Sequence, residues 1–334
     1  MESKVCVTGA AGYLGSSLVK RLLEKGHMFT QLRGIWVTFS SLFAVFGSSV
    51  CSWHLSCMVR LAGDAYKVGL LKSLPNAETR LRLCEADIYN PSEFQAAIEG
   101  CQFVVHMATP LQHLSQNSQF KDATEAAVAA VKSIVECCIT SGTVKRLIYT
   151  ASVVASSTLK EDGEGFKDQL DESCWTSHGV AFAYSTDQLM AYASSKAASE
   201  KELLRYNGAI EIVSLALGLV GGGTLLSTMP GSVNVLISQV TNNKAVYNTL
   251  RFLEELLGKV PILHVEDVCD AHIFCLEKPS INGRFLCATA YLSSAEIASH
   301  YRMIFPDIQI PDEFVEKLDR KIVWGSTKLK DAGF

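Results

Sequence analysis

The stretch Val5-Cys6-Val7-Thr8-Gly9-Ala10-Ala11-Gly12-Tyr13-Leu14-Gly15 decides the fold of this chain. Its β-branched start predicts a buried strand that ends at a glycine, and residues 16–25 follow with apolar side chains at helical spacing. In a strand–turn–helix unit, Gly9 permits the tight turn, Gly12 lets the backbone approach a pyrophosphate, and Gly15 lets helix and strand pack closely. The alternative is an ordinary strand-to-helix turn, but this context favours a dinucleotide-binding site.

The composition excludes several classes of protein. With 334 residues, the chain is long enough for one large domain or for a nucleotide-binding domain with a smaller companion. Its net charge of −4 argues against a nucleic-acid partner. Eleven cysteines occur without a Cys-x-x-Cys pair, which favours reduced, buried thiols over a disulfide framework or a metal site. Residues 1–4 leave no room for a cleaved signal before the first strand, so we expect a cytoplasmic protein.

Strand and helix patterns alternate along most of the chain. This alternation predicts an α/β fold with a doubly wound parallel sheet. Beyond about residue 221 the pattern becomes irregular and proline-rich, which predicts a smaller C-terminal cap over the carboxyl ends of the strands. We therefore expect a nucleotide-binding domain at residues 1–220 and a substrate-binding cap at residues 221–334. The expected strands are 81–87, 103–108, 144–150 and 210–217, and the expected helices are 91–100, 121–140 and 186–205.

One segment breaks the composition of the chain, because residues 34–59 contain no Asp, Glu, Lys or Arg. A membrane span is one interpretation. Serines interrupt the apolar run, however, and a span here would separate the glycine loop from its own sheet, so we expect none. We interpret residues 28–59 as an insertion that resembles translated non-coding sequence, because its aromatic residues would be unusual on an exposed loop. The alternative is an extra apolar or membrane-facing helix packed over the nucleotide-binding domain.

Three further residues are candidates for chemistry. Tyr192 and Lys196 lie four residues apart and therefore on one face of a predicted helix. Ser152 follows a predicted strand, at the edge of the sheet where ligands bind. A solvated helix pair and a loop serine are the ordinary interpretations of each residue alone. The order of glycine loop, serine after a strand and Tyr-x-x-x-Lys on the next long helix is specific as a combination.

That combination closely resembles the plant dihydroflavonol reductase and anthocyanidin reductase branch of the extended short-chain dehydrogenase/reductase family. The resemblance runs from Lys4 to Phe334, apart from the insertion, and it implies a Rossmann-type sheet with NADP as the cofactor. Other matching stretches are His106-Met107-Ala108-Thr109-Pro110, Thr143-Val144-Lys145-Arg146-Leu147, Asp171-Glu172-Ser173-Cys174-Trp175 and residues 264–273.

The resemblance also implies the role of each site residue. Tyr192 is the expected proton donor, and Ser152 is expected to orient the substrate oxygen. Lys196 is expected to lower the pKa of the Tyr192 phenol, which is about 10 in a free tyrosine, and to hold the nicotinamide ribose. His106 is expected to be structural. The residues implied in cofactor binding are Gly9, Gly12, Tyr13, Leu14, Gly15, Arg60, Lys67, Asp87, Ile88, Ala108, Thr109, Tyr192 and Lys196.

Two arginines compete for the 2′-phosphate of NADPH, Arg33 and Arg60. NADP-dependent relatives place an arginine after the second strand, where NAD-dependent enzymes place an acid. The family pattern Val-Arg…Lys-Val is kept by Arg60 with Lys67, whereas Arg33 has no matching lysine. We therefore predict that Arg60 and Lys67 bind the phosphate.

The sequence departs from the family pattern at several positions. Ser157 stands where dihydroflavonol reductases carry an asparagine that contacts the flavonoid, and the chain stops at Phe334, before a helix that the family usually continues into, so we expect a C-terminal truncation. The function that fits best is NADPH-dependent reduction of a phenolic or flavonoid-like carbonyl or an anthocyanidin. One alternative is a catalytically impaired nucleotide-binding protein with a disrupted second strand. The other is a sterol-type dehydrogenase of the same superfamily.

Overall fold

The fold is that of a computed structural model, which describes residues 3–25, 53–59, 65–88, 90, 93–109, 120–160, 163–177, 182–316, 318 and 320–334. Arg33, Arg60 and residues 28–52 of the predicted insertion lie outside these ranges.

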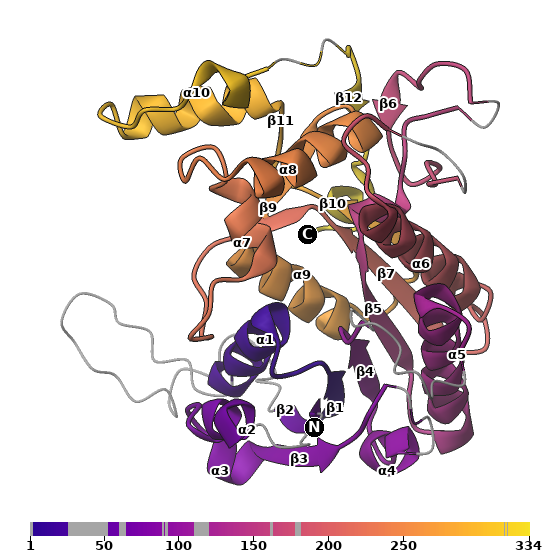
Figure 1. The fold of residues 1–334 in the computed structure, drawn as a ribbon. Coiled ribbons are helices and arrows are strands. Elements are labelled where there is room, and N and C mark those ends of the chain that lie inside the picture. The colour runs from indigo at the N-terminus through magenta and orange to yellow at the C-terminus, as the bar shows by residue number, and fades with distance from the viewer. Residues whose placement is uncertain are drawn as a thin grey trace, which may run out of the picture.

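A parallel sheet forms the centre of the molecule. Its strands are β1 (Ser3–Thr8), β2 (Trp53–Val59), β3 (Leu81–Glu85), β4 (Phe103–His106), β5 (Arg146–Ser152), β7 (Glu211–Leu217) and β10 (Gly283–Cys287). All seven are parallel, in the order β10-β7-β5-β4-β1-β2-β3 (Figure 1). The order reverses between β1 and β4, which is the position where such sheets bind ligands.

Helices cover both faces of this sheet (Figure 1). On one face, Leu18 of α1 (Tyr13–Glu24) shares a buried cluster with Val268 of α9 (Val265–Glu277). On the other face, Ile134 of α5 (Ala123–Ser141) shares a cluster with Leu203 of α6 (Asp187–Leu204). Apolar coverage of both faces explains why β5 and β7 are buried almost throughout. The predicted doubly wound α/β fold is confirmed. The remaining helices of this half are α2 (Ala65–Lys72), α3 (Ala77–Arg80) and α4 (Phe94–Ile98).

The second strand of the sheet is complete. β2 pairs with β1 from Ser3↔Trp53 to Thr8↔Met58, and with β3 from Leu55↔Leu81 to Val59↔Glu85. The hypothesis of a disrupted second strand is therefore wrong. The predicted insertion at residues 28–59 also needs correction, because residues 53–59 are a paired strand inside the sheet and not part of an added segment.

A smaller cap lies over the carboxyl ends of the strands. Its elements are β8 (Leu219–Gly221), α7 (Gly231–Leu236), α8 (Lys244–Leu257), β9 (Val260–His264), β11 (Ala290–Leu292), α10 (Ser294–Ile304) and η3 (Asp312–Phe314). β11, β9 and β8 form a three-stranded sheet. The predicted boundary at residue 220 does not follow these layers, because α9 and β10 return from the cap to the large sheet.

Two short segments link the C-terminal end of the chain to the rest. β12 (Val323–Trp324) pairs with β6 (Gln169–Leu170), and α11 (Lys328–Asp331) follows it. None of the helices within the described ranges is both long and apolar enough to cross a membrane.

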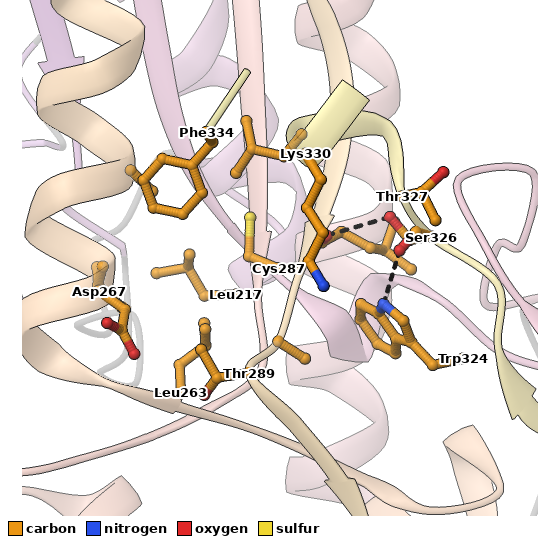
Figure 2. A pocket seen from close by; sticks show the side chains of 15 residues that line it. Leu217, Leu263, Asp267, Cys287, Thr289, Trp324, Ser326, Thr327, Lys330 and Phe334 are labelled. Carbon is orange, nitrogen blue, oxygen red and sulfur yellow. Dashed lines mark hydrogen bonds between the residues drawn. The ribbon is translucent and has the colours of Figure 1, made fainter. Parts of the chain in front are cut away.

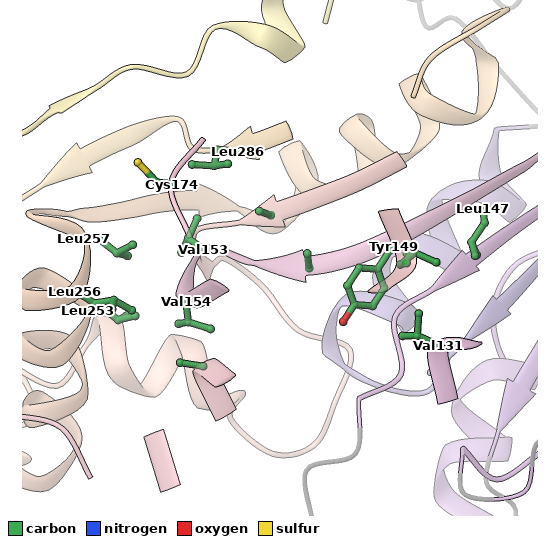
Figure 3. Close-up of a cluster of buried hydrophobic side chains, with 14 of the residues drawn as sticks. Val131, Leu147, Tyr149, Val153, Val154, Cys174, Leu253, Leu256, Leu257 and Leu286 are labelled. Carbon is green, nitrogen blue, oxygen red and sulfur yellow. The ribbon is translucent and has the colours of Figure 1, made fainter. Parts of the chain in front are cut away.

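One buried cluster connects the sheet with the cap (Figure 3). Leu147 of β5 and Leu286 of β10 belong to the same cluster as Leu253 and Leu256 of α8. Each such leucine contributes about 2 kcal/mol when it is fully buried. The cluster therefore holds α8 firmly beside the carboxyl end of β5, where Ser152 lies.

Candidate active site

The glycine loop after β1 is shaped by contacts that only glycine permits. Gly9 has φ +69°, in the left-handed region, and the Gly12 N–H donates to its carbonyl at 3.0 Å. A Cβ atom on Gly15 would lie 2.2 Å from the Gly9 carbonyl oxygen, and one on Gly9 would lie 2.8 Å from the Ala108 nitrogen. The loop therefore brings the start of α1 close to both β1 and the residues that follow β4.

The N-terminus of α1 has the character of an anion site. Gly12 is its N-cap residue and supplies no side-chain hydrogen bond, and the first turn carries no acid. Among helices of ten or more residues in the described ranges, α1 alone begins in this way. The open amides and the positive end of the helix dipole fit a diphosphate. Side chains cap the others, namely Asp122, Thr186, Asn243, His264 and Ser293.

A hydrogen-bond network joins the ends of β1 and β4. The backbone N–H groups of Met107 and Ala108 both donate to Thr8 Oγ1 at 3.2 Å, and Thr8 Oγ1 lies 2.7 Å from His106 Nδ1. Because both amides donate, the Thr8 hydroxyl donates its own proton to His106, whose Nδ1 is therefore an acceptor. Burial, reinforced by the charge of Lys196, lowers the pKa of His106 to about 3. His106 is a neutral, structural residue.

Ser152, Tyr192 and Lys196 converge next to this network. Ser152 ends β5, close enough to the Tyr192 phenol for its hydroxyl to lower the pKa of that group. The other two residues lie on α6, where the Lys196 ammonium donates to Thr109 Oγ1 at 2.8 Å and to the Thr150 carbonyl at 3.4 Å. The Lys196 nitrogen lies 6.0 Å from the centre of the Tyr192 ring. The structure thus brings together residues from the segment after β4, from β5 and from α6 that lie 87 positions apart at most.

Burial determines the protonation of both residues on α6. It raises the pKa of Tyr192, and the Ser152 hydroxyl offsets this only in part. The net pKa of Tyr192 is therefore raised, because withdrawing a phenolate from water outweighs its favourable interactions here. Burial also lowers the pKa of Lys196 to about 8, with the charge of Glu200 acting in the opposite direction.

These residues open into one cavity of about 340 Å³. Tyr13 and Leu14 of the glycine loop line it together with Thr109, Ser152, Tyr192 and Lys196. The rest of its lining is mostly apolar and comes from the segment after β5, from α6 and from the cap, and sequence analysis did not identify it because no local motif marks it. The apolar lining includes Val153, Val154, Leu189, Leu219, Phe252 and Leu253.

The other predicted cofactor residues lie away from this cavity. Asp87 and Ile88 follow β3, and the Asp87 backbone N–H donates to Glu93 Oε2 at 2.7 Å. Lys67 lies exposed on α2. These three residues are on the side of the sheet that extends from β1 toward β3, and Arg60 falls outside the described residues.

A second cavity, of about 220 Å³, lies between α9 and the C-terminal segment (Figure 2). Leu217 lines both cavities, and Trp324 and Phe334 lie at opposite ends of the second one. None of the predicted site residues lines it. The cavity that contains Tyr192 is therefore the candidate active site.

Comparisons with known proteins agree with this geometry. The sequence profile of the NAD-dependent epimerase/dehydratase family matches residues 56–286. An anthocyanidin reductase from Vitis vinifera is 31% identical and covers 100% of this chain and 90% of its own length. A dihydroflavonol 4-reductase from Gerbera hybrida is 31% identical over 99% of this chain and 81% of its own.

The fold is also found in a solved reductase. Vestitone reductase from alfalfa superposes with a TM-score of 0.73 at 29% identity, over 99% of this chain and 92% of that chain. Family and relatives indicate a nicotinamide cofactor and an NAD(P)-dependent oxidoreductase. This chain belongs to the NAD-dependent epimerase/dehydratase family of extended short-chain dehydrogenases/reductases, in which it is similar to plant anthocyanidin and dihydroflavonol reductases.

Proposed function

We propose that this protein is an NADPH-dependent reductase that acts on a phenolic, flavonoid-like carbonyl compound or an anthocyanidin. The observation that carries the proposal is the shared cavity, in which Tyr13 and Leu14 of the glycine loop lie with Ser152, Tyr192 and Lys196. A dinucleotide whose diphosphate binds at the start of α1 would extend into this cavity beside the proton donor.

The proposed chemistry follows from the three polar side chains. When bound, NADPH supplies the hydride for the substrate carbon. Ser152 orients the substrate oxygen by a hydrogen bond, and Tyr192 transfers its phenolic proton to that oxygen as negative charge develops there. The raised pKa keeps Tyr192 protonated at neutral pH, and a developing alkoxide is a stronger base than the phenolate left behind. Lys196 then stabilises that phenolate from its position one helical turn away.

The apolar side of the cavity supports an aromatic substrate. Leu189, Phe252 and Leu253 can bury a planar ring, and such contacts favour large aromatic surfaces. The relatives named for anthocyanidin and dihydroflavonol reduction point to the same class.

A preference for NADPH over NADH forms part of this proposal. In the sequence Arg60 is the residue after β2, and Lys67 lies in α2, which follows that strand. We expect Arg60→Ala to reduce the ratio of NADPH to NADH affinity, and Arg33→Ala to leave it unchanged. The opposite pattern would assign the 2′-phosphate to Arg33.

Fluorescence titration with NADPH, followed by turnover measurements, tests the function. We expect saturable NADPH binding and oxidation of NADPH when a dihydroflavonol or an anthocyanidin is added. A 3-ketosteroid serves as the comparison substrate. Binding without turnover on any carbonyl would support a nucleotide-binding protein instead, and turnover confined to the steroid would support a sterol-type dehydrogenase.

A further inference from the structure

An ion pair is buried behind the proposed site. Glu200 lies one helical turn beyond Lys196 on α6 and is fully buried, and Arg284 of β10 is 5% exposed. Glu200 Oε1 accepts hydrogen bonds from Arg284 Nε at 3.0 Å and from Ser214 Oγ at 2.5 Å. Buried ion pairs are costly to desolvate and often stabilise a fold no more than apolar residues of the same volume.

Arg284 connects the two segments that carry the catalytic candidates. Its Nη2 donates to Ser156 Oγ at 2.8 Å, and Ser156 lies four residues beyond Ser152, across the short helix η2 (Val153–Ala155). Its Nε binds Glu200, which shares α6 with Tyr192 and Lys196. One guanidinium therefore bridges the segment after β5 and the helix that carries the proton donor.

The guanidinium is itself held in a fixed orientation. Its Nη1 donates to the carbonyls of Glu172 and Cys174, at 2.9 Å and 2.5 Å, and it stacks on the Trp175 ring at 3.6 Å. A planar guanidinium restrained by several partners is a more rigid link than a lysine would be.

We propose that the Glu200–Arg284 pair is a positioning device for the reaction: it fixes the Ser152 segment against α6, and its Glu200 carboxylate keeps the Lys196 ammonium charged. This inference rests on the proposed function. Glu200 and Arg284 are positioning residues, because the groups that would meet substrate and cofactor are Ser152, Tyr192 and Lys196.

The surroundings of Lys196 leave Glu200 as the group that supports its charge. His106 on β4 and His272 on α9 are neutral, because burial lowers the pKa of these histidines to about 3 and about 4. Tyr149 on β5 faces Lys196 at 5.5 Å, and burial raises its pKa. Tyr192 is protonated as well. Among the described residues, Glu200 is the anion whose charge acts on Lys196, opposing the effect of burial.

Glu200 in turn has one cation and several neutral groups around it. Arg284 from β10 is its cation, and Ser214 from β7 is its neutral donor. Cys287 of β10 is a neutral thiol, because burial raises its pKa. Within the described ranges Glu200 Oε2 is buried and has no hydrogen-bond partner. Few hydrogen bonds therefore neutralise the carboxylate, and its charge acts on neighbouring groups through a medium of low polarity.

The variant Glu200→Gln tests the proposal, because it keeps the shape of the side chain and removes its charge. The pKa of Lys196 is measured by NMR in protein labelled at lysine Cε, with the signal assigned by its loss in Lys196→Arg. We expect Lys196 to lose its proton at lower pH, with a proton affinity about tenfold weaker. The alkaline limb of the turnover profile should move in the same direction. Glu202→Gln is the matched control on the same helix, since Glu202 pairs with other cations, Lys132 of α5 and Arg205.

A folded Glu200→Gln protein with an unchanged Lys196 titration would overturn the electrostatic half of the proposal. Should this variant not fold, the double variant Glu200→Gln/Arg284→Met leaves no unpaired buried charge. Lys196 should again titrate below its wild-type pH, by a smaller margin because a cation is removed too. A titration at or above the wild-type pH would contradict the proposal.

The variant Ser156→Ala tests the geometric half. It frees Arg284 from the Ser152 segment without changing any charge, so we expect kcat to fall severalfold while the NADPH Kd and the Lys196 titration stay constant. An unchanged kcat in Ser156→Ala would contradict the geometric half of the proposal. Absence of turnover in the wild-type protein would contradict the proposed function. The NMR titration needs no substrate, so it would still test whether Glu200 acts on the pKa of Lys196.

Discussion

Two walls of one cavity are built by opposite means. The glycine wall, residues 9–15, offers backbone amides, begins a helix without a side-chain cap and leaves no space for a Cβ atom at Gly15. The α6 wall consists of Tyr192 and Lys196 on α6 together with Ser152 at the end of β5. Unlike α1, α6 begins with a side-chain cap, from Thr186. The first wall depends on the absence of side chains. The second depends on side chains whose pKa values are shifted by burial. Binding and proton transfer can therefore be disrupted separately.

The largest effect expected on cofactor binding is at the glycine wall. In Gly15→Ala the new Cβ would lie 2.2 Å from the Gly9 carbonyl oxygen, where backbone must move. Overpacking of this kind costs about 3 kcal/mol, so we expect the NADPH affinity to fall about 100-fold or the free energy of unfolding to fall by that amount. Titration and chemical denaturation measure both quantities.

Gly69→Ala is the matched control for that variant. A Cβ there meets nothing within 4 Å, and the residue lies inside α2, so alanine should raise the free energy of unfolding by up to about 1 kcal/mol. Wild-type NADPH affinity and stability in Gly15→Ala would contradict the account of the glycine wall.

The next effect concerns the two buried histidines beside the walls. His106 bonds to Thr8 below the glycine wall, and His272 accepts from Thr150 next to Lys196. Their folded pKa values of about 3 and about 4 lie below the ordinary 6.5, so the unfolded chain binds protons more readily. Their contribution to stability is complete above about pH 6.5 and is lost as the pH falls toward these values. We expect a loss of about 3 kcal/mol for each histidine at pH 4.

Denaturant unfolding at pH 7 and pH 4 measures this loss. His106→Asn should make the stability of the protein less dependent on pH over that range, and His300→Asn, at an exposed position, serves as the control variant. Equal pH dependence in the wild type and in His106→Asn would show that His106 is not held neutral in the folded protein.

The smallest effect tests a helix that, unlike α1, is fully capped. In α10 the Ser293 and Glu296 side chains form a capping box, and Lys259 also contacts Glu296. Hydrogen bonds from the Ser293 backbone, from Lys259 and from the Ser293 hydroxyl lower the pKa of Glu296 to about 2. Glu296→Ala should cost about 1 kcal/mol at pH 7. The difference from wild type should disappear as the pH falls from about 4.5 to about 2, because the carboxylate that makes the box is then protonated.

The sequence predicts the glycine wall better than the α6 wall, because glycine spacing acts through local backbone geometry. The strands, α6 and the sheet order near Gly9 follow from short patterns. The direction of the pKa of Tyr192 does not, since burial arises from β5, α6 and the cap together. The Glu200–Arg284 pair joins residues 84 positions apart, and the return of β10 to the large sheet is equally long-range. Glu200 does continue the four-residue spacing of Tyr192 and Lys196, which is a signal that could have singled it out.

The central claim is that the glycine wall binds the cofactor while the α6 wall delivers the proton. Tyr192→Phe tests it most directly, because this change removes only the phenolic hydroxyl. NADPH affinity by fluorescence titration and turnover with a phenolic carbonyl substrate are measured side by side in wild type and variant. We predict an NADPH Kd within about twofold of wild type and a kcat lower by about 10²- to 10⁴-fold. Turnover in Tyr192→Phe at the wild-type rate would contradict the account.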